Sequence, residues 1–199
     1  MSRCSIGDAT IGKRAMSTIS FSMSVSLDGY VNDPDGGLDW HRVDDELHRH
    51  FNDLDREVGC HVYGRRLYET MRYWDSIDDN SDVSDPEREY ARIWQDIPKY
   101  VFSNSLTAVP DNYTLLDGDL EGELESLSRT YDSEIAVGGP TLAGPLIDRG
   151  IVNELRRYVV PVVLGGGTPY FTDDVGRLEC TLLETRTFDT GVIMERYAI

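Results

Sequence analysis

Long hydrophobic runs are missing from this sequence of 199 residues, although hydrophobic residues make up 40% of it. A membrane-spanning helix needs about 20 consecutive apolar residues, and no stretch reaches even about 18. The first sixteen residues, MSRCSIGDATIGKRAM, also lack the apolar core of a secretory signal peptide. We therefore expect a cytoplasmic protein with no membrane partner. The composition changes after residue 16, which predicts a disordered tail over 1–16 and a single domain over 17–199.

Cysteine is scarce, with only Cys4, Cys60 and Cys180. An odd number of cysteines without short spacings predicts neither a disulfide framework nor a zinc site. We accordingly expect no metal. Cys60 lies in an apolar-leaning run, which is typical of a buried, inert thiol.

Lysine is almost absent, because Lys13 and Lys99 are the only two lysines. The chain has 36 Asp and Glu against 19 Lys and Arg, for a net charge of −17. A nucleic-acid partner is disfavoured, since the phosphate backbone would be repelled. Self-repulsion also opposes folding, and salt at about 1 M would screen it because the Debye length is then about 3 Å. Both a salt-adapted protein and an acidic protein from a GC-rich genome fit this composition.

Strand-like and helix-like segments alternate along most of the chain. Alternation of apolar residues with serine predicts a strand within 18–32. Further strands are expected at 60–63, 98–104, 113–117 and 135–137, and helices at 44–58, 65–74, 86–95, 120–131 and after 139. The last strands, within 152–167, 178–188 and 191–199, have no helix between them. This order predicts an α/β fold with a mixed, mainly parallel central sheet flanked by helices and antiparallel C-terminal strands.

Three of the predicted parallel strands end in residues that suit a bound anion. These residues are Gly64 and Arg65, Ser103 and Asn104, and Gly138 and Gly139. Open parallel sheets bind ligands at the carboxyl ends of their strands, where helix N-termini and glycine turns accept phosphate. Tight strand–helix packing and a solvated arginine would explain the same residues. The sequence contains neither G-x-G-x-x-G nor G-x-x-x-x-G-K, so it lacks the two best-known phosphate motifs.

Five segments together resemble a known family. FSMSVSLDGYVNDPDGGLDW, YGRRLYETM, VFSNSL, IAVGGPTLAGPLIDRGIVNEL and VVPVVLGGGTPYF occur in this order within residues 17–199. They are similar to the dihydrofolate reductase-like superfamily, and more closely to the branch with the reductase domain of the bifunctional riboflavin-biosynthesis deaminase–reductase. The resemblance implies a homodimer with NADPH as cofactor. It also implies hydride transfer to a C=N-type bond or a ring-opened ribose of a small pterin- or pyrimidine-like substrate.

The resemblance also implies roles for single residues. Gly64 and Arg65 would hold cofactor phosphate, Ser103 would lie at the adenosine 2′-phosphate with Asn104 beside it, and Gly138, Gly139, Thr141 and Leu142 would surround the pyrophosphate. The backbone of Ser24 would face the nicotinamide, and Val31 and Trp40 would border the substrate cleft on a mobile loop. In true dihydrofolate reductases the Gly-Gly bond is cis, which makes the bond between Gly138 and Gly139 a test of the likeness.

A proton donor is expected shortly after the loop tryptophan if the likeness to dihydrofolate reductases extends to catalysis. Those enzymes carry a buried acid there, and counting from Trp40 gives Asp45 as the candidate catalytic residue. Such a role requires a carboxyl group in an apolar pocket. An acidic first turn of a helix would explain Asp45 equally well, and riboflavin-type reductases do not use this acid. His41 and His48 are alternatives that we interpret as surface histidines.

Two other functions remain open on the sequence. One is a true dihydrofolate reductase, and the other is a non-catalytic nucleotide-binding protein that keeps the cofactor cleft. The H-x-E and C-x-x-C zinc signature of a deaminase is missing, so the riboflavin interpretation implies a 5-amino-6-(5-phosphoribosylamino)uracil reductase-like protein that stands alone. A phosphorylated substrate would need a basic partner, for which Arg42, Arg149 and Arg177 are candidates.

Overall fold

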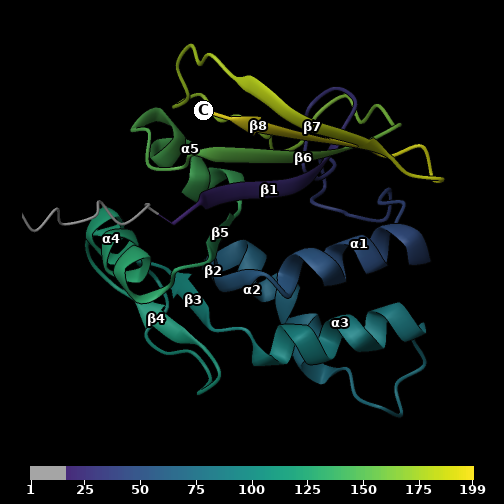
Figure 1. Cartoon of the computed structure of the whole chain (residues 1–199), viewed down its shortest axis with the longest axis horizontal. Helices are drawn as coiled ribbons and strands as arrows, with labels where there is room; N and C mark the ends of the chain where they lie inside the picture. The colour runs from purple at the N-terminus through teal and green to yellow at the C-terminus, as the bar shows by residue number, and fades with distance from the viewer. Residues whose placement is uncertain (1–16) are drawn as a thin grey trace, which may run out of the picture.

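The computed structural model describes residues 17–199, and the predicted tail over 1–16 lies outside the described residues. A single sheet of eight strands runs through the molecule in the order β4-β3-β2-β5-β1-β6-β8-β7 (Figure 1). The strands are β1 (Ile19–Ser26), β2 (Val58–Gly64), β3 (Lys99–Phe102), β4 (Thr114–Leu116), β5 (Glu134–Gly138), β6 (Glu154–Val160), β7 (Thr181–Thr187) and β8 (Ile193–Ala198). The first six are mutually parallel, β8 pairs antiparallel with β6, and β7 pairs antiparallel with β8. The predicted mixed sheet with antiparallel C-terminal strands is therefore confirmed.

Helices cover both faces of the sheet. They are α1 (Asp45–Asp55), α2 (Arg65–Met71), α3 (Asp85–Asp96), α4 (Leu120–Thr130) and α5 (Pro140–Asp148), with a 3-10 helix η1 (Arg72–Ser76) after α2. Apolar residues of α4 and α5, such as Leu124 and Leu146, pack with Phe21 of β1. On the opposite face α1 packs on β6 and β8, and α2 and α3 pack on β2 and β3. Figure 1 shows the two groups of helices on either side of the sheet. None of the helices within residues 17–199 has the length and apolar character needed to cross a membrane.

Local side-chain chemistry explains where the helices start. Asp44 is the N-cap of α1, and its carboxylate accepts a hydrogen bond of 2.9 Å from the backbone of Leu47. Ser84 and Glu87 form a reciprocal capping box at the start of α3. These caps supply partners for backbone N–H groups that a helix cannot satisfy within itself.

Several predicted boundaries are wrong by a few residues. The predicted helix over 44–58 ends at Asp55, because Val58 already pairs with Glu134 as part of β2. The predicted helix over 65–74 is α-helical only as far as Met71 and then tightens into η1. The strand predicted within 152–167 ends at Val160, and the chain then leaves the sheet as a loop.

One of the two lysines closes the C-terminal end of α3. Lys99 is only 2% exposed, and its ammonium group donates to the carbonyls of Trp94 at 2.6 Å and Ile97 at 2.9 Å. It also lies over the rings of Trp94 and Tyr113. The last carbonyls of a helix lack intrahelical donors and carry partial negative charge, so a buried cation is stabilising here.

Cys60 is fully buried as predicted, and burial raises the pKa of its thiol to about 12.

Two polar contacts of His50 link α1 to the strands β6 and β7. Its Nε2 lies 3.0 Å from the hydroxyl of Tyr158 in β6, and its Nδ1 lies 3.4 Å from a guanidinium nitrogen of Arg186 in β7. Burial, and next the charge of Arg186, lower the pKa of His50 below its ordinary value. Folding therefore favours the neutral form of this imidazole.

This half-buried histidine makes the stability depend on pH. The folded-state pKa of His50 is depressed, so below the unfolded value of about 6.5 the unfolded chain binds a proton that the folded chain resists. The stabilisation is complete above that pH and is lost as the pH falls. We expect His50→Gln, which cannot be protonated, to lose less free energy of unfolding than the wild type between about pH 7.5 and about pH 5.5. Urea unfolding at each pH measures this difference, and parallel curves for the two proteins would contradict it.

Candidate cofactor site

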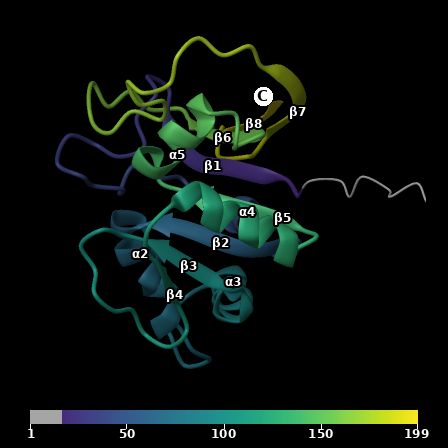
Figure 2. The same cartoon turned by 90° about the vertical axis from the view of Figure 1, so that its left-hand side faces the viewer.

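The carboxyl ends of the parallel strands meet at one edge of the sheet. Gly64, the last residue of β2, pairs with Phe102 of β3, and Tyr63 pairs with Gly138 of β5. The three phosphate-compatible strand ends predicted from the sequence are therefore neighbours in space. Figure 2 shows the loops that follow β1, β3 and β6 extending from this edge, to the left of the sheet.

The two adjacent positions are occupied by glycine for different physical reasons. A Cβ atom at Gly138 would lie 2.5 Å from side-chain atoms of Leu67 and Tyr63, so packing alone requires glycine there. Gly139 instead has a φ of +98°, which L side chains rarely adopt. The nearest atom to a Cβ there is Leu67 Cβ at 3.9 Å, so the space beside this backbone is open. Gly138 is explained by tight packing, whereas Gly139 leaves an accessible backbone at the start of α5.

The bond between Gly138 and Gly139 is trans. No cis peptide bond occurs in residues 17–199. The cis bond of true dihydrofolate reductases is thus not reproduced, and the left-handed conformation of Gly139 makes the turn. The carbonyl of Gly139 accepts the first helical hydrogen bonds of α5, from Leu142 and Ala143.

A cationic and hydroxyl-rich cluster joins the ends of β2 and β3. Arg65 donates from Nη1 to the hydroxyl of Ser105 at 3.1 Å, and its Nε donates to Glu69 at 2.9 Å. The hydroxyls of Ser103 and Ser105 are 3.3 Å apart, and Asn104 between them is exposed. Arg65 is about half exposed, so its guanidinium can reach a ligand. A guanidinium beside two hydroxyls is a favourable donor set for a phosphate group.

The start of α5 adjoins the same strand end. A Cβ at Gly64 would lie 3.6 Å from Leu142 Cβ, so the first turn of α5 lies against the end of β2. Thr141 in that turn is exposed. The structure thus brings together Gly64, Arg65, Ser103, Asn104, Gly138, Gly139, Thr141 and Leu142 at one edge.

The pairing of β1 with β5 ends well before β1 does. Pairing between these strands stops at Phe21 and Val137, whereas β1 continues to Ser26 alongside β6 alone. β5 therefore offers no strand partner to the backbone of Ser24 on that side. Ser24 is half-buried and stands next to the glycine turn in the sheet order. This is the position at which the resemblance implies contact between backbone and nicotinamide.

The loop after β1 is tied to the loop after β6. The carboxylate of Asp28 accepts from the hydroxyl of Ser26 at 2.7 Å and from the backbone N–H groups of Leu164 and Gly165 at 3.1 and 2.7 Å. These hydrogen bonds, that from Ser26 first, lower the pKa of Asp28. The side-chain oxygen of Asn32 likewise accepts from the backbone of Thr168. The segment LGGGTPYF (164–171) is held by these bonds at the edge that carries the glycine turn.

Val31 and Trp40 lie in this region but point inward. Val31 is only 5% exposed, belongs to the core beneath α4 and α5, and donates its backbone N–H to Thr168. Trp40 packs on the core under α1, and its indole donates to the carbonyl of Gly37 at 3.2 Å. Both residues support the loop that would border a substrate.

Asp45 has a different environment from the one that the proton-donor hypothesis assumes. Its side chain is 59% exposed and pairs with Arg49 at 3.3 Å, whereas the preceding Asp44 is the helix cap. The structure therefore shows an ordinary acidic helix start in place of an apolar pocket. The interpretation as a surface residue is wrong for His48, which is buried against Asn52. His41 is half-buried, and burial lowers its pKa; its Nε2 has no hydrogen-bond partner among the described residues.

The three candidate arginines for a substrate phosphate differ in their surroundings. Arg149 pairs with Glu121, and Arg177 pairs with Glu179. Arg42 is exposed in the loop between Trp40 and the start of α1. That loop leaves the same edge of the sheet, so Arg42 is the best placed of the three.

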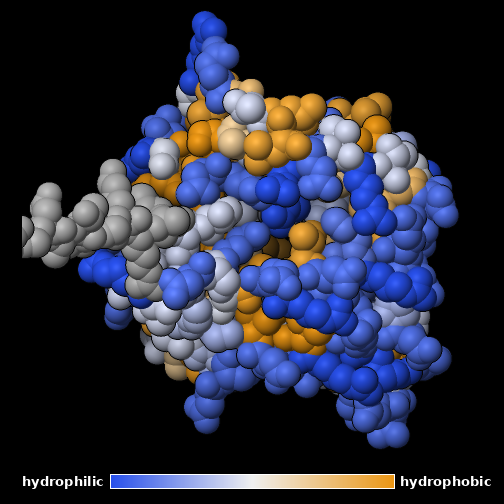
Figure 3. All heavy atoms as spheres, viewed as in Figure 1, coloured by the Kyte–Doolittle hydropathy of each residue, from blue (hydrophilic) through white to orange (hydrophobic). Residues whose placement is uncertain are grey.

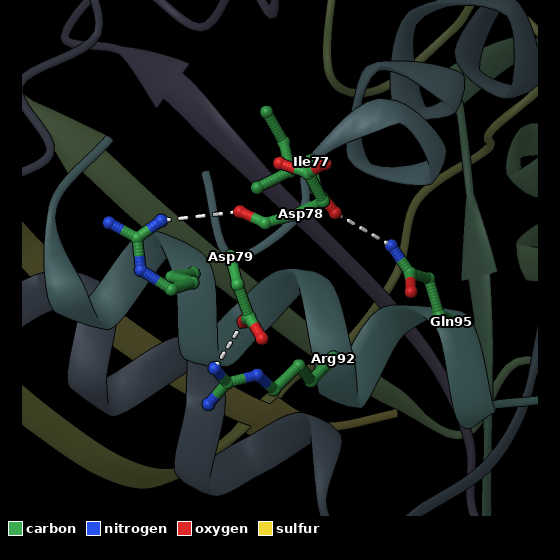
Figure 4. A pocket seen from close by; sticks show the side chains of 6 residues that line it. Ile77, Asp78, Asp79, Arg92 and Gln95 are labelled. Carbon is green, nitrogen blue, oxygen red and sulfur yellow. Dashed lines mark hydrogen bonds and ion pairs between the residues drawn. The ribbon is translucent and has the colours of Figure 1, made fainter. Parts of the chain in front are cut away.

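A separate shallow pocket of about 250 Å³ lies between α3 and the loop before it. Figure 4 shows its lining residues paired with one another: Arg92 with Asp79, and Gln95 with the carbonyl of Ile77. Arg88 likewise donates to the carbonyl of Asp78. The polar groups of this pocket are therefore already hydrogen-bonded or ion-paired with one another. The pocket is also remote from the strand ends. Residues 17–199 contain no group of three or more metal-ligating side chains arranged around a common point.

Comparison with known proteins places this geometry in a family. The family model described as the RibD C-terminal domain matches residues 17–194. The chain therefore belongs to the RibD C-terminal domain family. Among curated proteins, it is 28% identical over 180 residues to the uncharacterized protein YyaP of Bacillus subtilis, covering 90% of this chain and 93% of YyaP.

Solved structures share the fold. RibD of Acinetobacter baumannii superposes with a TM-score of 0.70 at 17% identity, over 92% of this chain and 58% of that one. A dihydrofolate reductase from Enterococcus faecalis complexed with NADP(H) gives a TM-score of 0.60 at 14% identity, over 91% of this chain and 94% of that one. The predicted dihydrofolate reductase-like fold is confirmed.

Proposed function

We propose that the protein is an NADPH-dependent reductase of a small pterin- or pyrimidine-like heterocycle, similar to 5-amino-6-(5-phosphoribosylamino)uracil reductases. The observation that carries this proposal is the cluster of Arg65, Ser103 and Ser105 beside the open backbone of Gly139. On a chain with a net charge of −17, a dinucleotide needs such a local set of donors before it can bind. The family membership and the NADP(H)-bound relative of the same fold support the proposal.

The residues of the site fit the parts of NADPH. Arg65 and Ser103 would hold the 2′-phosphate, since a guanidinium and hydroxyls supply charge-assisted hydrogen bonds. The start of α5 would hold the pyrophosphate, because Gly139 carries no side chain over the backbone there. The backbone of Ser24 would orient the nicotinamide where β1 continues beyond its pairing with β5. When bound, the cofactor supplies the hydride.

The environment of Asp45 favours a riboflavin-type reductase over a true dihydrofolate reductase. The latter would need this acid in an apolar pocket to protonate its substrate, and here the acid is in an exposed ion pair. The acceptor would enter between the loops that follow β1 and β6. Arg42 lies on the first of these loops and would bind an anionic group of the acceptor.

Arg65→Gln tests the proposal through cofactor preference. A hydrogen bond to a charged group is worth about 1.5–3 kcal/mol, which corresponds to a loss of about 10–100-fold in affinity. We expect the dissociation constant for NADPH to rise by this factor and that for NADH to stay nearly constant. Arg92→Gln is the matched control, because it removes one exposed, ion-paired charge remote from the strand ends. An equal effect of Arg65→Gln on both nucleotides would contradict the assignment of the 2′-phosphate site.

A further inference from the structure

Arg66, near the start of α2, has no acidic partner among the described residues. Most arginines within residues 17–199 are ion-paired with a carboxylate, and Arg88 donates to backbone carbonyls instead. The exceptions are Arg42, Arg66 and Arg72. Arg72 lies over the ring of Tyr68, and Arg42 belongs to the loop after β1. Arg66 is thus an exposed guanidinium that the fold itself does not use.

Arg66 projects between the two parts of the proposed cofactor site. The residue before it, Arg65, contacts Ser105 at the end of β3. The residue after it, Leu67, lies against the glycine turn, with its Cβ 3.9 Å from where a Cβ of Gly139 would be. Successive residues of a helix point about 100° apart. Since Arg66 is exposed, it lies on the solvent side of α2 between the directions of Arg65 and Leu67.

The helix itself does not explain a cation at this position. The helices α1, α3 and α4 each have two acidic residues in the first turn, where the partial positive charge of the N-terminus stabilises them. The helix α2 begins with Arg65 and Arg66 and has no acidic residue in its first turn. Cations there oppose the helix dipole, so the start of α2 is electrostatically unfavourable for the helix alone.

The donor cluster around Arg65 has no net charge of its own. Arg65 donates to the carboxylate of Glu69 at 2.9 Å, and Ser103 and Ser105 are neutral. A dinucleotide with a 2′-phosphate carries several negative charges and must approach a chain with a net charge of −17. Hydrophilic residues predominate on the face of the molecule in Figure 3, and acidic residues outnumber basic ones by 36 to 19 in the sequence. An unpaired cation is needed to offset this repulsion.

We propose that Arg66 binds the pyrophosphate of the cofactor, while Arg65 binds the 2′-phosphate. A guanidinium can donate two parallel hydrogen bonds to phosphate oxygens, and such charge-assisted bonds are stronger than those between neutral groups. The proposed position of the pyrophosphate is beside Gly139, which adjoins α2 through Leu67. This inference rests on the proposed function and adds to it the cation that the pyrophosphate requires.

Arg66→Gln tests the assignment through two nucleotides that share a pyrophosphate. Because NADPH and NADH both contain this group, we expect both dissociation constants to rise by at least about 10-fold in fluorescence titrations. Arg65→Gln, by contrast, is expected to affect NADPH alone. The matched control is Arg72→Gln, which removes an exposed arginine without an acidic partner after the end of α2. This control should leave both constants nearly unchanged.

Two further measurements separate binding from folding. Arg66→Gln should unfold at the same temperature as the wild type or slightly higher, because it removes a cation that opposes the dipole of α2. Arg66→Lys should bind both nucleotides more tightly than Arg66→Gln, since lysine retains the charge. Unchanged dissociation constants in Arg66→Gln would overturn the inference, as would a loss of affinity confined to NADPH. A wild type that binds neither nucleotide would contradict the proposed function, and this inference with it.

Discussion

Gly139→Val is expected to abolish measurable binding of NADPH while the protein remains folded. The φ of +98° strains any residue with a Cβ by about 1–3 kcal/mol. The valine side chain would also fill the open space beside the backbone, where we propose that the pyrophosphate lies. Fluorescence titration with NADPH measures the effect, and we expect a rise of at least about 100-fold in the dissociation constant, which is about 2.7 kcal/mol.

Gly150→Val is the matched control for this substitution. Gly150 also has a positive φ, of +68°, and open space around it, but it lies between α5 and the start of β6, at the opposite edge of the sheet. Both variants should therefore lose a comparable amount of stability, and only Gly139→Val should lose NADPH. If the two bind NADPH equally well, Gly139 is a turn residue with no role in cofactor binding.

Lys99→Met is expected to destabilise the protein much more than the loss of an exposed charge does. The substitution leaves the carbonyls of Trp94 and Ile97 without their buried donor. Hydrogen bonds to charged groups are worth about 1.5–3 kcal/mol, so we expect a loss of about 3 kcal/mol. For a domain of this size, that lowers the melting temperature by about 6–12 °C.

An exposed charge provides the comparison for Lys99. Arg92 pairs with Asp79 with both side chains mostly exposed, and such pairs are worth at most about 1 kcal/mol. Thermal unfolding of Arg92→Met should therefore differ little from the wild type. Equal melting temperatures for Lys99→Met and Arg92→Met would show that the buried ammonium group does not hold the end of α3.

Local patterns in the amino-acid sequence predicted much of this fold. The alternation of apolar residues with serine identified β1, and strands alternating with helices predicted the parallel part of the sheet. The order of the strands then explains why Arg65 and Ser103, which are far apart in sequence, lie at one edge. The residue between them in space, Ser105, was not assigned a role, because its contact with Arg65 depends on how two loops approach each other.

Other features depend on tertiary contacts that no local pattern records. The segment after Val160 is apolar enough for a strand, but it is held as a loop by Asp28 and Asn32 from the other end of the chain. The run of acids at 44–46 could not show which residue caps α1 and which is exposed, because a shift by one position changes the direction of the side chain. The burial of His48 and the partial burial of His41 likewise follow from the way α1 and its preceding loop pack.

The most direct test of the account is a fluorescence titration of the wild-type protein with NADPH and with NADH, at low salt and at about 1 M salt. The two salt conditions guard against repulsion by a chain that carries −17. We predict saturable binding of NADPH that is at least about 10-fold tighter than binding of NADH, which is about 1.4 kcal/mol. Folded protein that binds neither nucleotide at either salt concentration would contradict the account and leave the glycine turn as a packing feature.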